Sequence, residues 1–275
     1  MADKTLFPTG KSKVEIAWVE CGTSSQKGTP SVNFKLSNGE QAIVHRCYTT
    51  DKAMWQIENM AKAAGVQKLA AVKAAKEAND SGLLALFKGK QVEVEVVVDE
   101  YENKDGAIAE GREVKSVALS NPTKDGEHLA SIEAVDFSKS RAKGTISMDL
   151  LLRSSDGSSV WVPRWVTDKS IWQLEDVAIC VGVDPAKIVE AAKKQSIVGV
   201  HPLLGKKIKI VLKSEDVELA DGRKVVNQNL VAIDSMDKGI REYMRARRDA
   251  RIQGNKFIKP PPAPSVDLSS DEIPF

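Results

Sequence analysis

The sequence predicts a mainly β protein with helical inserts, an α+β fold made of two similar copies and followed by a disordered tail. Three observations support this prediction: a long internal duplication, the same succession of strand and helix patterns in both copies, and a run of prolines and acids after the second copy. A length of 275 residues also favours two domains over one.

The duplication is clearest in two segments that match without a gap. "TTDKAMWQIENMAKAAGV" ends at Val66 and "VTDKSIWQLEDVAICVGV" ends at Val183, so the copies are 117 positions apart. This period is too long for a solenoid repeat and indicates a duplicated domain. We predict domains at residues 1–122 and 123–236, joined where "NPTKDGE" supplies turn-forming residues.

Both copies show the same order of elements. Alternating apolar residues predict strands, and a 3.6-residue apolar period after capping residues predicts helices. In the first copy the expected elements are strands at 13–20, 32–36 and 41–48, helices from 51 to about 78, and strands at 92–98 and 114–119. In the second copy they are strands at 132–137, 145–153 and 160–166, helices within 168–194, and strands at 206–213 and 225–233.

Three strands, a helical insert and two strands follow the order of the OB-fold, a five-stranded Greek-key barrel. We therefore predict two tandem OB-fold-like five-stranded barrels, an order that other small barrels share. The insert is a pair of helices, which is longer than in the simplest OB pattern. OB barrels bind oligonucleotides or oligosaccharides across one face and its flanking loops.

Aromatic and basic residues on the expected strands of the first copy are candidates for DNA contact. Proteins that bind single-stranded DNA combine basic side chains along the phosphates with aromatic rings that stack on bases. The candidates are Trp18 on the first strand, His45, Arg46 and Tyr48 on the third, and Lys27 in the loop between the first two strands. Loop lysines are more often simply solvated.

The second copy offers a matching set: Arg141, Lys143, Arg153, Trp161, Arg164 and Trp165. Trp161 and Trp165 lie on one face of a strand, where either core packing or base stacking explains them. Arg164 lies on the opposite face and is paired with Arg46, so these two arginines are expected to contact phosphates. Trp55 and Trp172 occupy the same helical position in both copies and are interpreted as core residues.

A basic segment follows the second copy. Residues 238–251 predict a helix in which only Glu242 and Asp249 oppose the positive charges. It is interpreted either as a solvated surface helix or as an arm, residues 237–259, that follows a phosphate backbone. In the second interpretation Arg245 and Arg248 contact DNA.

The last residues form a proline-rich spacer and an acidic tip. The spacer "PPPAP" begins at Pro260 and rules out helix and strand, so residues 260–275 are expected to be disordered. The ending Asp271-Glu272-Ile273-Pro274-Phe275 resembles the acidic tail of bacterial single-stranded DNA-binding proteins. The two copies do not resemble the single-barrel bacterial proteins in sequence, so the chain looks like a phage-encoded or otherwise divergent member.

This resemblance implies a role for each tail residue. In the family the terminal Phe and its carboxylate enter a basic-rimmed apolar pocket on replication, recombination and repair proteins. Carried over, Pro274 and Phe275 are anchors beside Ile273, while Asp271 and Glu272 steer the encounter by charge. The family's base-stacking residues have no counterparts that can be transferred to this chain.

Composition and motifs argue against several classes of function. The net charge is only +2, three cysteines form no C-x-x-C pair, and no phosphate loop or catalytic motif is present. We expect no enzymatic activity, no cofactor or metal and no membrane partner. We expect the protein to be in a reducing cytoplasm, which is that of a bacterial host if the chain is phage-encoded.

The predicted function is sequence-tolerant binding and protection of single-stranded DNA in replication, recombination and repair, with the tail recruiting DNA-processing proteins. Two alternatives are a protein-interaction adaptor of the replication machinery and an RNA or duplex-DNA binder. The oligomeric state stays open between a monomer and a homodimer.

Overall fold

The structure is a computed structural model that describes residues 6–24, 27–102, 108–140, 143–218 and 224–253. The predicted tail, including Asp271 to Phe275, lies outside the described residues. Within the described residues no helix is long and apolar enough to span a membrane. The same residues contain no cluster of three or more His, Cys, Asp or Glu side chains placed to hold a metal ion.

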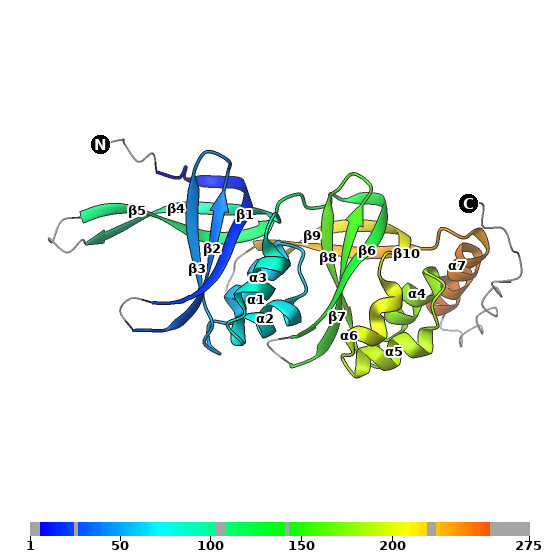
Figure 1. The fold of residues 1–275 in the computed structure, drawn as a ribbon. Coiled ribbons are helices and arrows are strands. Elements are labelled where there is room, and N and C mark those ends of the chain that lie inside the picture. Colours follow the sequence, from blue (N-terminus) through cyan, green and yellow to red (C-terminus); the bar gives the residue numbers. More distant parts are fainter. Residues whose placement is uncertain (1–5, 25–26, 103–107, 141–142, 219–223, 254–275) are drawn as a thin grey trace, which may run out of the picture. The chain divides into compact units, whose positions relative to one another are not determined.

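The first copy folds into one sheet with helices after its third strand (Figure 1). Its elements are β1 (Gly10–Thr23), β2 (Pro30–Ser37), β3 (Ala42–Tyr48), α1 (Trp55–Ala63), α2 (Lys68–Lys76), α3 (Asp80–Phe87), β4 (Gln91–Glu102) and β5 (Ile108–Leu119). The sheet order is β3-β2-β1-β4-β5, with antiparallel neighbours.

The second copy repeats this order and adds a final helix. Its elements are β6 (Gly126–Lys139), β7 (Ile146–Ser154), β8 (Ser159–Trp165), α4 (Trp172–Cys180), α5 (Pro185–Lys193), α6 (Ile197–Val200), the 3-10 turn η1 (His201–Leu203), β9 (Lys207–Glu218), β10 (Lys224–Asp234) and α7 (Lys238–Ile252). The sheet order, β10-β9-β6-β7-β8, is the same as in the first copy when corresponding strands are compared.

The predicted class, mainly β with helical inserts, is confirmed, whereas the predicted closed barrels are not. In the described residues β3 and β5 are the two edges of the first sheet, and β8 and β10 are the edges of the second. A closed barrel would require hydrogen bonds between those edges. Each copy is therefore a curved five-stranded sheet with an open seam.

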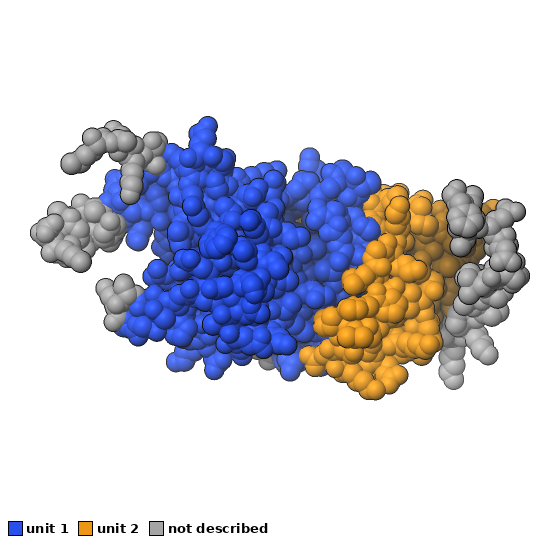
Figure 2. Space-filling model, viewed as in Figure 1, with its two compact units in different colours: residues 1–124, 131–165 blue, residues 125–130, 166–275 orange. Residues whose placement is uncertain are grey.

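By density of contacts the chain divides into two compact units (Figure 2). The first comprises residues 1–124 and 131–165, and the second comprises residues 125–130 and 166–275. The division passes through β6, so strands β7 and β8 group with the whole of the first copy.

A bulge in β1 decides which residues of the first sheet face the core. Ile16 pairs with Leu36, but Trp18 pairs with Lys35, so the ladder is irregular at Ala17. Such an extra residue reverses the direction of every side chain that follows it. Val19 thereby points into the core and is 1% exposed, while Trp18 points outward and is 46% exposed.

The helices after β3 close the core from one side. Phe87 of α3 packs edge-to-face on Phe34 of β2, with ring centroids 5.0 Å apart, and both are fully buried. The sequence predicts a pair of helices here, but the insert contains a third, α3. Its start is fixed by Asn79, whose side chain accepts a hydrogen bond from the Gly82 backbone N–H.

The basic helix predicted after the second copy is present as α7 and packs against α4. Arg247 is 5% exposed and forms ion pairs with Glu175 and with Asp176, the second at 3.0 Å. Arg251 contacts Asp176 at 2.6 Å and lies 4.1 Å from the Trp172 ring centroid. The inner face of α7 is thus part of the fold of the second unit.

Candidate nucleic-acid interface

The outward side of strands β1, β2 and β3 carries an exposed surface that combines an aromatic ring with basic side chains. Two rows of paired residues cross these strands, and we call them together the first outer face: Trp18, Lys35 and Val44 in one row, and Glu20, Asn33 and Arg46 in the next. Together with Ala17, five of these six residues line a shallow hollow of about 400 Å³. The opposite side of the same strands is buried core.

Trp18 offers an accessible ring beside positive charge. Its ring has the Lys88 ammonium nitrogen 5.9 Å from the centroid, and Lys35 is its partner across the ladder. Both lysines are exposed. An exposed aromatic ring with lysines nearby is the combination that holds bases and phosphates in single-strand binders.

Arg46 and Tyr48 extend this surface along β3. The Arg46 Nε donates a 3.0 Å hydrogen bond to Asn33 Oδ1, which holds the guanidinium over the sheet while the residue stays exposed. Tyr48 is half-buried and pairs with Ser31 in the next row. The backbone N–H of Tyr48 donates to Gln56 Oε1, so the end of β3 is fixed by α1.

His45 is placed on the other side of β3. It pairs with the fully buried Phe34 and lies between Ile43 and Cys47, which are core residues. Burial lowers the pKa of His45 to about 4. At neutral pH the imidazole is uncharged, so it offers no ionic contact to phosphate.

Replacing His45 with valine is expected to make the protein less sensitive to acid. The unfolded histidine takes up a proton near pH 6.5, while the folded one does so only near pH 4, so the wild type loses stability as pH falls through this window. The loss amounts to roughly 2–3 kcal/mol and is absent in His45→Val. Urea unfolding at pH 7 and pH 4.5 measures the difference, and equal losses in both proteins would contradict it.

The register of the second sheet shows which residues correspond to the first outer face. In the hairpin between the first two strands of each copy, the Ser24 N–H donates to the Thr29 carbonyl and the Ser140 N–H donates to the Thr145 carbonyl, so equivalent residues are 116 positions apart there. After the third strand the distance is 117, from Thr50 to Thr167, so the second copy has one more residue in the turn between β7 and β8. The corresponding rows, which we call the second outer face, are Ala134, Leu151 and Trp161, and then Asp136, Asp149 and Pro163.

This correspondence corrects the pairing of Arg46 with Arg164. Arg46 matches Pro163, and Arg164 matches the buried Cys47. Arg164 is itself 8% exposed, on the inward side of β8. The matched segments that end at Val66 and Val183 are 117 positions apart, and this offset, carried back to β3 and β8, gives the same correspondence, whereas the pairing of Arg46 with Arg164 used an offset of 118.

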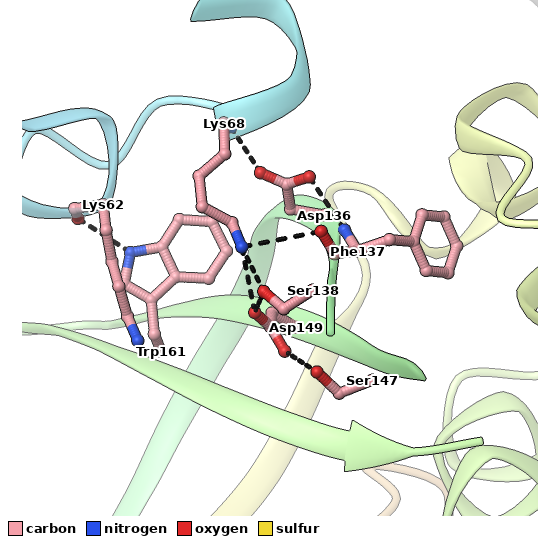
Figure 3. A network of polar contacts seen from close by, with 8 residues as sticks. All are labelled: Lys62, Lys68, Asp136, Phe137, Ser138, Ser147, Asp149 and Trp161. Carbon is pink, nitrogen blue, oxygen red and sulfur yellow. Dashed lines mark hydrogen bonds and ion pairs between the residues drawn. The ribbon is translucent and has the colours of Figure 1, made fainter. Parts of the chain in front are cut away.

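The two tryptophans of β8 differ in their surroundings. Trp161 is 9% exposed, and its indole Nε1 donates a 2.8 Å hydrogen bond to the Lys62 carbonyl of α1 (Figure 3). This is the packing alternative that the sequence left open. Trp165 corresponds to Tyr48 and is 38% exposed, so its ring faces solvent.

The other basic candidates lie at scattered places. Arg153 contacts Glu133 at 2.5 Å and donates to the Gly157 carbonyl, while Lys27 and Lys143 are exposed in the hairpin loops. Arg245 is exposed on α7, and the half-buried Arg248 donates to the Ile233 carbonyl. Arg141 lies outside the described residues.

Sequence reasoning did not single out Asn33 and Lys35 of the first outer face, nor Lys88, which lies beside it. Lys35 stands between the core residues Phe34 and Leu36, so strand alternation alone could have placed it outward. Lys88 follows α3, which the sequence did not predict. The expectation that Trp55 is a core residue is wrong, because its side chain is 47% exposed at the start of α1.

No protein-family model matches the chain, and no curated protein matches it. One solved structure that does match is a deletion mutant of the single-stranded DNA binding protein from Thermus aquaticus. The identity is 8%, the match covers 83% of this chain and 95% of that chain, and the TM-score is 0.20.

Proposed function

We propose that this protein binds single-stranded DNA without sequence preference and has no enzymatic activity. The observation that carries the proposal is the first outer face, where the exposed Trp18 ring lies with Lys35 and Arg46 on one sheet surface and has the Lys88 ammonium group beside it. Phosphate contacts supply affinity, and stacking tolerates any base because every base has a π-face.

The strand order supports an OB-like assignment of each copy. The order β3-β2-β1-β4-β5 with helices after β3 is that of an OB barrel whose seam between β3 and β5 is open. In that fold the face of the second and third strands holds the ligand. The first outer face occupies this position.

The tail supplies the second half of the proposal. Asp271 to Phe275 recruit replication, recombination and repair proteins in the cytoplasm, with Phe275 as the anchoring ring. Its acids also compete with DNA for basic residues, since a tethered anion is present at high effective concentration.

A gel shift with labelled oligo-dT, duplex DNA and RNA of equal length tests the first half. About 30 nucleotides is long enough to cover the site of an OB fold. We expect oligo-dT to bind tightest, with an affinity that falls as salt rises. Equal or tighter binding of duplex or RNA would favour the alternative ligands, and no binding at low salt, with or without the tail, would refute the proposal.

Deleting residues 267–275 tests the second half. We expect oligo-dT affinity to stay the same or increase, because the deletion removes a competing anion and no DNA contact. Capture of DNA-processing proteins on immobilised oligo-dT is expected to disappear. Phe275→Ala in the full chain is the matched control, since it keeps the acids and removes the anchor. A drop in DNA affinity on truncation would contradict this role.

A further inference from the structure

The first and second outer faces have diverged in chemistry although they occupy the same place in their sheets. At the positions of Trp18, Lys35 and Val44, the second copy has Ala134, Leu151 and Trp161. At the positions of Glu20, Asn33 and Arg46, it has Asp136, Asp149 and Pro163. The formal charge of these six positions therefore changes from +1 on the first face to −2 on the second.

Except at the exposed Pro163, the second outer face is covered by the start of α2 and the end of α1 (Figure 3). The Lys68 ammonium group lies 3.5 Å from Asp149 Oδ2 and also contacts the Ser138 hydroxyl. The Lys68 backbone N–H donates to Asp136, whose other oxygen accepts from the Phe137 N–H at 2.8 Å. The Lys68 ammonium group is thus already paired with these acids.

Apolar contacts complete the cover. Trp161, Leu151 and Ala134 form one buried cluster, and the Trp161 indole is bonded to Lys62. A β-carbon added to Gly65 would lie only 3.1 Å from a methyl carbon of Leu151, so the turn between α1 and α2 lies very close to β7. Gly65 has a φ of +67°, which is the left-handed conformation that glycine adopts without strain.

We infer that the second outer face is an internal docking surface for residues 62–68, and that the single strand crosses the first outer face alone. This inference rests on the proposed function and gives the two copies different roles. The first copy binds DNA, whereas the corresponding face of the second copy packs against residues 62–68 and binds none. A strand on the second face would have to displace Lys68 and then meet two carboxylates, which repel phosphate.

Corresponding positions on the two faces give a matched test. Arg46 and Pro163 are both exposed and occupy the same place in β3 and β8. We expect Arg46→Glu in the full chain to weaken oligo-dT binding roughly tenfold or more at low salt, and to reduce the salt dependence. Pro163→Glu is expected to change affinity by less than about twofold, because no phosphate approaches it.

Tryptophan fluorescence provides a second readout on the same oligonucleotide. Trp18→Phe is expected to remove most of the quenching by oligo-dT, whereas Trp161→Phe retains it. Equal weakening by Arg46→Glu and Pro163→Glu, or loss of quenching in Trp161→Phe, would overturn the inference while leaving single-strand binding intact. Absence of oligo-dT binding by the wild type would instead refute the proposed function itself.

Discussion

Replacing Trp18 with alanine is expected to weaken oligo-dT binding by roughly 5- to 140-fold. Stacking of one base on an aromatic ring is worth about 1–3 kcal/mol, and every 1.4 kcal/mol is a factor of ten in affinity. Trp18 is 46% exposed and points away from the core, so the substitution removes the stacking ring and leaves the fold in place. Anisotropy of a labelled oligonucleotide measures the loss.

Trp55→Ala is the matched control for this prediction. Trp55 is 47% exposed, almost the same as Trp18, but it lies at the start of α1 and outside the first outer face. Its loss is expected to leave affinity within about twofold, since no base reaches it. If both variants bind with wild-type affinity, or if both lose it equally, Trp18 has no special part in binding.

Replacing Lys68 with methionine is expected to destabilise the protein by about 3–5 kcal/mol. The Lys68 side chain is 13% exposed and the Asp149 side chain 9%, so the ion pair is largely out of water. Removing one partner of a buried pair leaves an uncompensated buried charge, and here Asp136 lies in the same network. Burial already raises the pKa of Asp136, which shows that its charge is poorly solvated.

Lys73→Met controls for the loss of a lysine on the same helix. The Lys73 side chain is 75% exposed and reaches Glu77 only at 4.0 Å, so its removal is expected to cost less than about 0.5 kcal/mol. The double variant Lys68→Met with Asp149→Asn is expected to recover part of the lost stability. Urea unfolding measures all three, and a Lys68→Met protein within about 1 kcal/mol of wild type would show that the network contributes little.

Much of the fold followed from local patterns in the sequence. Alternation in β2 and β4 and the helix-start pattern before α1 placed these elements at nearly the right residues. Local chemistry is sufficient there because each strand buries one face and each helix one stripe. The duplicated segments then extended each assignment from one copy to the other.

The candidate site was harder to predict, because two of its determinants are not visible in local patterns. The bulge at Ala17 turns Trp18 outward, whereas simple alternation would have placed it in the core with Val14 and Ile16. The burial of Trp161 depends on Lys62, which is 99 positions away in the sequence. A contact of that separation leaves no periodic signal.

The buried network around Lys68 also has a consequence for the order of folding. Its hydrogen bonds join Gln67 to Val135 and Lys68 to Ser138, so the chain must close loops of 68 to 70 residues to make them. Closing a long loop lowers the entropy of the chain before the non-local contacts that offset this loss have formed, so such contacts form late in folding. During synthesis the first sheet and its helices can therefore form before Asp136 and Asp149 have been added to the chain. Until then the Lys68 side chain is exposed to solvent, and it becomes buried only when it pairs with these carboxylates.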